Sequence, residues 1–159
     1  MALYEEKIVP EEIEKKNNIW FLDSGASNHM TGCRSWFSEL NESVTGTVKF
    51  GDGSQVEIKG RGDVMLQCEN GDHCILSDVY FIPKLKSNII SLGQLDEQDC
   101  KIEIEHGLLV IFTKAKELLA KVRQSRNRLY TISLKTTKPT CLLGSCLKTL
   151  GCGMLDMGI

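Results

Sequence analysis

One carboxylate in this sequence stands in a context that could do chemistry. The apolar run from Ile19 to Leu22 leads directly into Asp23, Ser24, Gly25 and Ala26. Two carboxylates that share one proton can activate a water molecule between them. The Asp-Ser-Gly pattern occurs once in the chain. We therefore expect half of a two-carboxylate site, with the other half supplied by a second copy of the chain.

The residues around Asp23 suit such a site. Ser24 can hydrogen-bond near the carboxylate and fix its orientation, while the small residues Gly25 and Ala26 let two backbones approach closely. Burial and a like-charged neighbour would raise one pKa, so that the pair holds a single proton. The alternative is that Asp23 is an ordinary turn residue at the end of a strand.

Size and composition limit the other possibilities. A chain of 159 residues is long enough for one domain, and a formal net charge of −2 gives no overall case for binding nucleic acid or a membrane. The stretch from Lys114 to Arg128 is locally basic, which we interpret as a solvated face. No apolar run approaches the roughly 20 residues needed to span a bilayer, and the start lacks a signal-peptide pattern, so we expect a cytoplasmic protein.

The cysteines predict no framework of bonds or metals. They are odd in number and contain no Cys-x-x-Cys pair, so we expect buried or free thiols. No metal or cofactor is expected. The seven cysteines are Cys33, Cys68, Cys74, Cys100, Cys141, Cys146 and Cys152.

Short β-type runs separated by Gly, Asp and Asn dominate the middle of the chain and predict an all-β barrel or sandwich. One short helix is expected over 91–98, with Ser91 as its N-cap. Residues 114–122 are ambiguous, because their propensity favours a helix. The expected strands include hairpins of 48–50 with 56–58 and of 63–68 with 73–76, and single strands over 78–82, 101–105, 108–112 and 129–134.

Several motifs, in a consistent order, resemble the protease region of Ty1/Copia-type retrotransposon Gag-Pol polyproteins. The segment from Trp20 to Thr31 is similar to the protease signature of that family. The other similar segments are Phe50 to Ser54, Val79 to Pro83, Asn88 to Leu95 and Asn127 to Tyr130. The resemblance covers residues 19–134.

The resemblance implies a retropepsin-like acid-protease β-barrel over residues 19–134, active as a homodimer on a polypeptide substrate. It implies that Asp23 is the catalytic carboxylate, and that 114–116 is a hairpin turn. It also implies no cofactor, no membrane or direct nucleic-acid contact, and a place in a virus-like particle if the element is active. The supporting loop would be Ser24, Gly25 and Ala26, and the mobile lid over the cleft would be Gly51, Asp52, Gly53 and Ser54.

The two ends of the chain differ from this middle part. Residues 1–18 form a polar lead-in, and residues 135–159 are expected to be a disordered, degenerate tail. In Copia-type polyproteins a zinc region similar to Trp-Leu-Trp-His-Ala-Arg-Tyr-Gly-His follows the protease. With suitable codons, that peptide read one base out of frame becomes Gly151 to Ile159. We therefore hypothesise that a frameshift produced the tail.

Two functions remain open at this stage. The first is an aspartic endopeptidase that processes a Gag-Pol polyprotein with one Asp23 from each protomer. The alternative is an inactive or domesticated β-barrel remnant that acts as an interaction module. A zinc-dependent nucleic-acid module is disfavoured, because the spacing of His and Cys does not suit a metal. His29 is interpreted as a surface or packing residue for the same reason.

Overall fold

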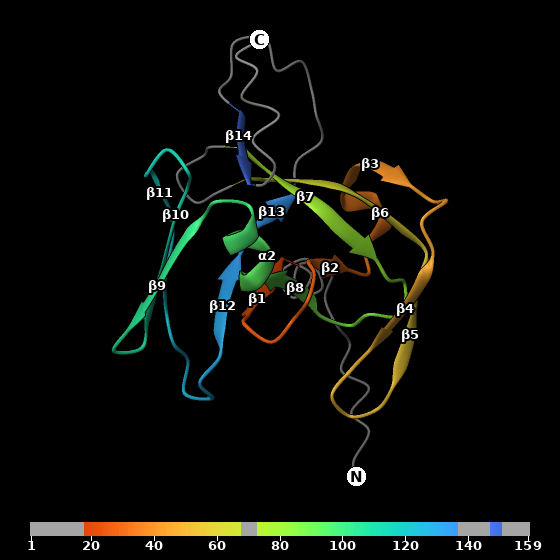
Figure 1. Cartoon of the computed structure of the whole chain (residues 1–159), viewed down its shortest axis with the longest axis horizontal. Coiled ribbons are helices and arrows are strands. Elements are labelled where there is room, and N and C mark those ends of the chain that lie inside the picture. Colours follow the sequence, from red (N-terminus) through yellow and green to blue (C-terminus); the bar gives the residue numbers. More distant parts are fainter. Residues whose placement is uncertain (1–17, 68–72, 137–146, 151–159) are drawn as a thin grey trace, which may run out of the picture.

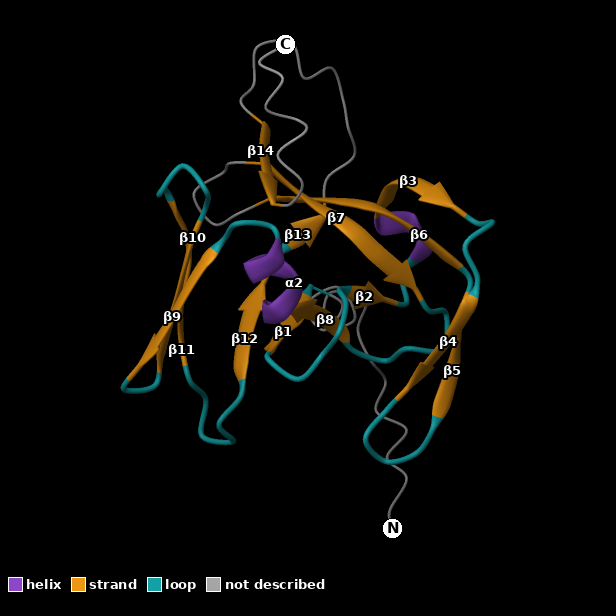
Figure 2. Ribbon diagram, in the orientation of Figure 1, coloured by secondary structure: helices purple, strands orange, loops and turns teal. Residues whose placement is uncertain are grey.

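The computed structural model describes residues 18–67, 73–136 and 147–150. Strands dominate it (Figure 1; Figure 2), together with one α-helix, α2 (Leu92–Glu97), and one 3-10 turn, η1 (Arg34–Trp36), in the described part of the chain. The strands are β1 (Ile19–Asp23), β2 (Met30–Thr31), β3 (Phe37–Asn41), β4 (Gly46–Lys49), β5 (Gln55–Ile58), β6 (Gly60–Gln67), β7 (His73–Phe81), β8 (Asn88–Ser91), β9 (Lys101–Glu105), β10 (Leu108–Phe112), β11 (Leu118–Arg123), β12 (Tyr130–Ser133), β13 (Lys135–Thr136) and β14 (Leu147–Leu150).

Three sheets contain these strands. The large sheet has the order β12-β1-β8-β2-β7-β6-β13, with β14 added to β7 and β3 added to β6. A three-stranded sheet has the order β11-β10-β9, and β4 pairs with β5 alone. The all-β class with one short helix is therefore confirmed, whereas the described strands form open sheets and do not close into a barrel.

The main core lies between the large sheet and the three-stranded sheet. Along β1 every second side chain is buried, so that Trp20 and Leu22 point inward. Val64, Leu66 and Leu76 join them from β6 and β7, Ile90 from β8, and Leu109 and Ile111 from β10. The alternation of apolar residues in these strands places one face of each sheet against this core.

A smaller core fixes the base of the β4–β5 hairpin. Met30, Ile58 and Ile82 are buried together, and Val48 and Phe50 pack against them. Met30 belongs to β2, which follows directly on the loop after β1. The hairpin is thus anchored, from Ile58 at its base to Phe50 beside its turn, to the region just beyond Asp23.

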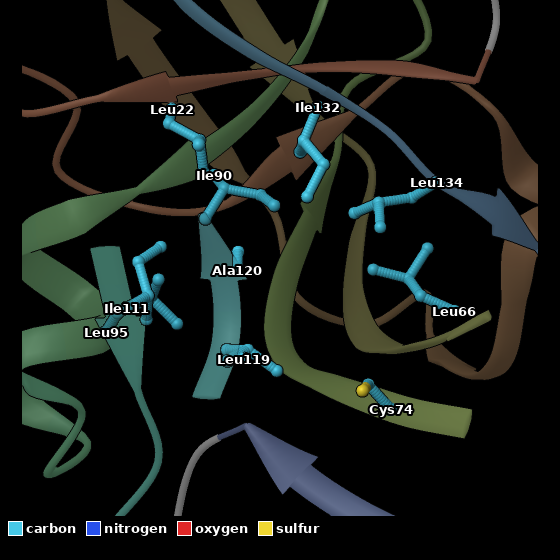
Figure 3. A pocket seen from close by; sticks show the side chains of 10 residues that line it. All are labelled: Leu22, Leu66, Cys74, Ile90, Leu95, Ile111, Leu119, Ala120, Ile132 and Leu134. Carbon is cyan, nitrogen blue, oxygen red and sulfur yellow. The ribbon is translucent and has the colours of Figure 1, made fainter. Parts of the chain in front are cut away.

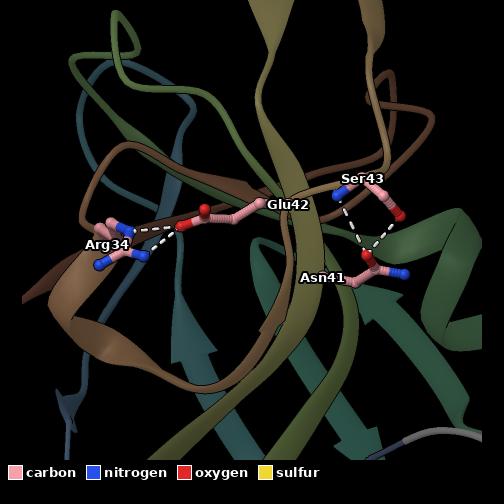
Figure 4. Close-up of polar contacts among 4 residues, drawn as sticks. All are labelled: Arg34, Asn41, Glu42 and Ser43. Atoms are coloured by element: carbon pink, nitrogen blue, oxygen red, sulfur yellow. Dashed lines mark hydrogen bonds and ion pairs between the residues drawn. The ribbon is translucent and has the colours of Figure 1, made fainter.

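Polar contacts hold the segment that carries Trp36, which stacks on Trp20. Trp36 in η1 stacks on Trp20 with ring centroids 5.7 Å apart. Arg34 forms an ion pair with Glu42, donating from Nε at 2.8 Å, and the Asn41 side chain accepts the backbone N–H of Ser43 at 3.0 Å (Figure 4). These contacts set the path from η1 into the turn after β3.

Several expectations about local structure are confirmed. Ser91 caps α2, since its side chain accepts the backbone N–H of Gln94. The segment 114–116 is a turn between β10 and β11, closed by the hydrogen bonds Thr113 N–H to Glu117 O and Lys116 N–H to Thr113 O, both at 2.8 Å. Sheet pairing therefore overrides the helical propensity of this stretch.

Other expectations differ from the structure or lie outside it. The separate strands predicted over 73–76 and 78–82 form one strand, β7, in which Asp78 takes φ 58° without ending the pairing. Two described pieces of the 135–159 tail join the large sheet as β13 and β14. The lead-in 1–17, the turn 69–72 and the rest of the tail lie outside the described residues, so the domain boundaries remain predictions.

Candidate functional site

Asp23 lies at the carboxyl end of β1, between β12 on one side and β8 on the other. In the parallel pairing with β8, Asp23 stands opposite Ser91. The backbone N–H of Gly25 donates to Asp23 Oδ1 at 2.7 Å and orients the carboxylate. The Asp23 side chain of a single chain is exposed. Burial of this carboxylate, expected for a two-carboxylate site, would therefore have to come from a second chain.

The small residues of the loop serve different purposes. A Cβ at Gly25 would lie 3.3 Å from Asp23 Oδ1, which is tight for the hydrogen bond that orients the carboxylate. The Ala26 backbone carbonyl accepts a hydrogen bond from Ser91 Oγ at 2.7 Å. Ser24 is exposed, and its hydroxyl makes no hydrogen bond with any described residue. The orientation expected from Ser24 is thus provided by the Gly25 backbone.

A buried polar network fixes this loop from below. Ser91 Oγ, which donates to the Ala26 carbonyl, also accepts the N–H of Gln94 at 3.0 Å. Gln94 Oε1 accepts the backbone N–H of His29 at 2.8 Å. Gln94 Nε2 donates to the carbonyls of Ser77 at 3.3 Å and of Asp78 at 3.2 Å. One glutamine side chain therefore joins the end of the loop, α2 and β7.

His29 completes the network as a neutral side chain. It is fully buried, and its Nδ1 accepts the backbone N–H of Ser91 at 2.9 Å. An accepting Nδ1 places the imidazole proton on Nε2. Burial lowers the pKa of His29 to about 4, and an interaction with the Gln98 side chain offsets part of that decrease. The interpretation of His29 as a packing residue fits this position, although it also orders the backbone of β8.

A second set of buried polar contacts joins β2, β8 and β1. Thr31 Oγ1 donates to Asn88 Oδ1 at 2.7 Å, and Asn88 Nδ2 donates to the Ile19 carbonyl at 3.0 Å. The N–H of Cys33 donates to Thr31 Oγ1 at 3.3 Å. Both ends of the loop that carries Asp23 are therefore held by β8.

The turn between β4 and β5 has a different construction. Phe50 donates its N–H to the Ser54 carbonyl at 2.9 Å, and Gly53 donates to the Phe50 carbonyl at 2.9 Å. Gly53 has φ +88°, a conformation that glycine adopts without strain. Ser54 donates to Asp52 Oδ1 from its backbone at 2.8 Å and from its hydroxyl at 2.6 Å, which lowers the pKa of Asp52.

The structure brings some of the expected site residues together and leaves others apart. Asp23, Ser24, Gly25 and Ala26 form one loop, as expected. The turn 51–54 is exposed, and no hydrogen bond among the described residues joins it to that loop. The connection between them is the small core, in which Phe50 and Val48 pack against the cluster that contains Met30.

Sequence reasoning identified Ser91 only as a helix cap and missed Gln94, Asn88 and Thr31. In the sequence each of these residues is only a polar side chain near the end of an apolar strand. Such a residue indicates a buried hydrogen bond only when its partner, distant in sequence, is known. Within the described ranges, no group of three His, Cys, Asp or Glu side chains could hold a metal ion. Cys33 and Cys100 are free thiols, and Cys74 and Cys100 are buried, as expected. No described helix is both long enough and apolar enough to cross a membrane.

Comparison with known sequences gives two kinds of match. The profile of the family described as "Pol polyprotein, beta-barrel domain" matches residues 20–100, which include the Asp23 loop, the 51–54 turn and α2. Over 77 residues the chain is 38% identical to a retrovirus-related Pol polyprotein from transposon TNT 1-94 of Nicotiana tabacum, covering 48% of this chain and 6% of that protein.

A second relative is a putative transposon Ty5-1 protein of Saccharomyces cerevisiae. It is 32% identical over 77 residues, which cover 48% of this chain and 49% of that protein. The matched region is therefore a small part of the tobacco protein and about half of the yeast protein.

Proposed function

Because this chain belongs to the Pol polyprotein beta-barrel domain family, we propose that it is the protease region of a Ty1/Copia-type retrotransposon Gag-Pol polyprotein. Both relatives carry transposon names, which favours an origin in a mobile element. The proposed fold is retropepsin-like, and the proposed activity is aspartic endopeptidase cleavage of a polyprotein. If the element is active, the protein works in the cytoplasm within a virus-like particle.

The observation that carries this proposal is the way Asp23 is presented. Its strand is held on both sides, its carboxylate is oriented by the Gly25 N–H at 2.7 Å, and its side chain is open to solvent. An ordinary turn aspartate needs no buried scaffold beneath it. Here Ser91, His29 and Gln94 fix the backbone around a carboxylate that has no hydrogen-bond partner among the described residues outside its own loop.

In the proposed reaction two Asp23 carboxylates, one from each protomer, share one proton across a water molecule. The ionised carboxylate removes a proton from the water, whose oxygen attacks the carbonyl carbon of the peptide bond. The protonated carboxyl donates its proton to the carbonyl oxygen. The carboxyl that took the proton from water donates it to the amide nitrogen, and the C–N bond breaks to release the amine. One hydroxyl of the intermediate returns its proton to the other carboxylate, so that the pair again holds a single proton. The step needs no metal or organic cofactor.

In the same proposal the β4–β5 hairpin is the lid. Its tip, residues 51–54, is exposed and, among the described residues, forms hydrogen bonds only within itself and with Phe50, whereas Ile58 at its base is buried in one cluster with Met30. A lid must move relative to the catalytic loop while remaining attached near it. The anchored base and free tip meet both requirements.

The alternative is a remnant that keeps the fold without the chemistry. It is favoured by one observation: in the described part of the chain the Asp23 side chain bonds only to Gly25, so no described contact of the core depends on the carboxylate. The scaffold would therefore survive loss of activity and could serve as an interaction module.

A cleavage assay on a peptide from a Gag-Pol junction separates these functions. Wild-type protein should cleave it in a pepstatin-sensitive manner, and Asp23→Asn should abolish cleavage. Asp96→Asn, the same change at an exposed side chain of α2, is the matched control and should retain activity. Equal turnover by wild type and Asp23→Asn would exclude Asp23 as the catalytic group, and absence of cleavage by all three would favour the remnant.

A further inference from the structure

Two consecutive strands, β11 and β12, end different sheets without pairing to each other. β11 is the outer strand of the three-stranded sheet, and β12 is the outer strand of the large sheet. The turn between them is closed by hydrogen bonds from Ser125 N–H to the Leu129 carbonyl at 2.8 Å and from Arg128 N–H to the Ser125 carbonyl at 3.0 Å. Figure 1 shows the two strands leaving this turn into separate sheets. The two strands are thus joined like those of a hairpin but diverge without pairing.

A groove of about 440 Å³ lies between the two strands and is lined by residues of both. Its floor is apolar, with Leu119 and Ala120 from β11, and Ile132 and Leu134 from β12 and just beyond it. The same four side chains also line a small cavity of about 30 Å³ in the main core (Figure 3). The groove therefore exposes the edge of the hydrophobic core between two strand edges.

The backbone of β12 offers hydrogen-bonding groups to this groove. Leu134 donates its N–H to the Asn18 carbonyl at 2.8 Å, which fixes the phase of the antiparallel pairing with β1. In such a pair, alternate residues bond to the partner and the others turn their N–H and C=O groups away. Ile132 therefore bonds to β1, while Thr131 and Ser133 direct their backbone groups toward the groove.

The backbone of β11 offers the matching groups from the opposite side. Gln124 donates its N–H to the Gly107 carbonyl at 2.7 Å, which sets the phase of pairing with β10. By the same alternation Val122 bonds to β10, while Lys121 and Arg123 direct their backbone groups away from it. Two strand edges of this kind, which pair with no other described strand, form a template for an added strand.

The charged side chains beside the groove indicate which side chains an added strand should have. The side chains of Lys121 and Arg123 are exposed, whereas Val122 between them is buried. Neither cation forms an ion pair in the described part of the chain. A strand in the groove would turn alternate side chains toward the apolar floor and toward these cations. The first set should be apolar and the second acidic.

We propose that the groove between β11 and β12 binds an extended polypeptide segment with alternating apolar and acidic side chains, which adds as a strand between the two edges. The site is separate from Asp23 and does not require proteolytic activity. It gives a role to the locally basic stretch that the proposed protease reaction does not use.

The first test measures binding of a fluorescent peptide of alternating Glu and Val to the full chain. Wild type should bind it, and the double variant Lys121→Glu/Arg123→Glu should bind roughly tenfold more weakly, as expected for loss of two surface charge pairs. The matched control Lys84→Glu/Lys86→Glu makes the same charge change in an exposed loop outside the groove and should bind like wild type. Equal weakening by both double variants would overturn a specific site.

The second test separates strand addition from simple attraction of an anion. The same peptide with N-methylated Val residues keeps its side chains but loses backbone donors, and it should not bind. Binding of the intact peptide should also slow hydrogen exchange at the amides of Lys121, Arg123, Thr131 and Ser133. Unchanged binding of the methylated peptide, or stronger binding of a short oligothymidylate at these residues, would overturn the proposal in favour of a polyanion surface.

Discussion

The loop after β1 and the turn between β4 and β5 contain the same three residue types but are held in place in opposite ways. Asp23 ends one strand and Ser24 and Gly25 follow it, whereas residues 52–54, Asp-Gly-Ser, connect two others. The first loop is held by hydrogen bonds to side chains and backbone more than 60 positions away in sequence. The turn is held by hydrogen bonds among residues 50–54 alone. The residue types of a loop therefore do not determine how firmly it is held. The positions of its hydrogen-bond partners do.

Burial is the physical cause of this difference. The partners of the first loop are His29, Ser91 and Gln94, all buried, so that each hydrogen bond lost there leaves a polar group without water. The turn is exposed, so water replaces any bond that breaks. A catalytic carboxylate benefits from the first arrangement, and a lid benefits from the second.

The largest expected effect is a pH dependence that belongs only to the first loop. Burial lowers the pKa of His29 from 6.5 to about 4. Between pH 6.5 and pH 4, His29 is therefore protonated in the unfolded chain and neutral in the folded chain. The free energy of unfolding should therefore fall by about 3 kcal/mol as the pH decreases from 6.5 to 4, and this loss should level off at lower pH. Urea denaturation at several pH values measures it.

Other groups titrate in the same range, so paired variants are needed. His29→Gln should remove this part of the pH dependence, whereas His106→Gln, at an exposed turn position, should leave it unchanged. If His106→Gln removed it and His29→Gln did not, the buried neutral imidazole would be excluded as its source.

A serine-to-alanine change at each place should give unequal losses of stability. Ser91→Ala removes the hydroxyl that bonds both the Ala26 carbonyl and the Gln94 N–H, and should cost about 2 kcal/mol. Ser54→Ala also removes a hydroxyl hydrogen bond, to Asp52, but it should cost less than about 0.5 kcal/mol because the site is exposed. Equal losses in chemical denaturation would contradict the distinction between the two regions.

The smallest expected difference between paired variants concerns the conformation of the turn itself. Gly53→Ala places a side chain at φ +88° and should cost about 1 kcal/mol of stability. Gly51→Ala is the control, since a Cβ there would meet no atom within 4 Å and φ is not in the left-handed region. Thermal denaturation compares the two; a Gly51→Ala loss as large as that of Gly53→Ala would show that the turn conformation is not the cause.

The contrast also explains what the sequence could predict. Features coded by near neighbours were predictable: the Asp23 loop at a strand end, the Asp-Gly hairpin turn and Ser91 as the cap of α2. The polar network was not, because His29 and Gln94 are unremarkable in sequence and acquire partners only when β7, β8 and α2 assemble around the end of the loop. Whether Asp23 is catalytic and 51–54 is a lid remains a prediction from the family resemblance.

Pairing between distant strands produced the other differences. Asp78 was placed at a boundary between two strands, but a bulge opposite Gly62 and Val64 lets β7 continue through it. Gly62 itself lies so close to β3 that a Cβ would stand 1.9 Å from the Glu39 carbonyl oxygen. Nothing local in the sequence marks that approach, since it depends on a strand more than 20 positions away.

The central claim is that two protomers each supply one Asp23 to a shared site, and a mixing experiment tests it most directly. Cleavage of a Gag-Pol junction peptide is measured with wild type at fixed concentration, before and after equilibration with an equal amount of Asp23→Asn. If the site is shared, random pairing leaves roughly half of the wild-type chains in wild-type dimers, and the rate should fall to about half. An unchanged rate would show that one chain carries a complete site, and would contradict the account.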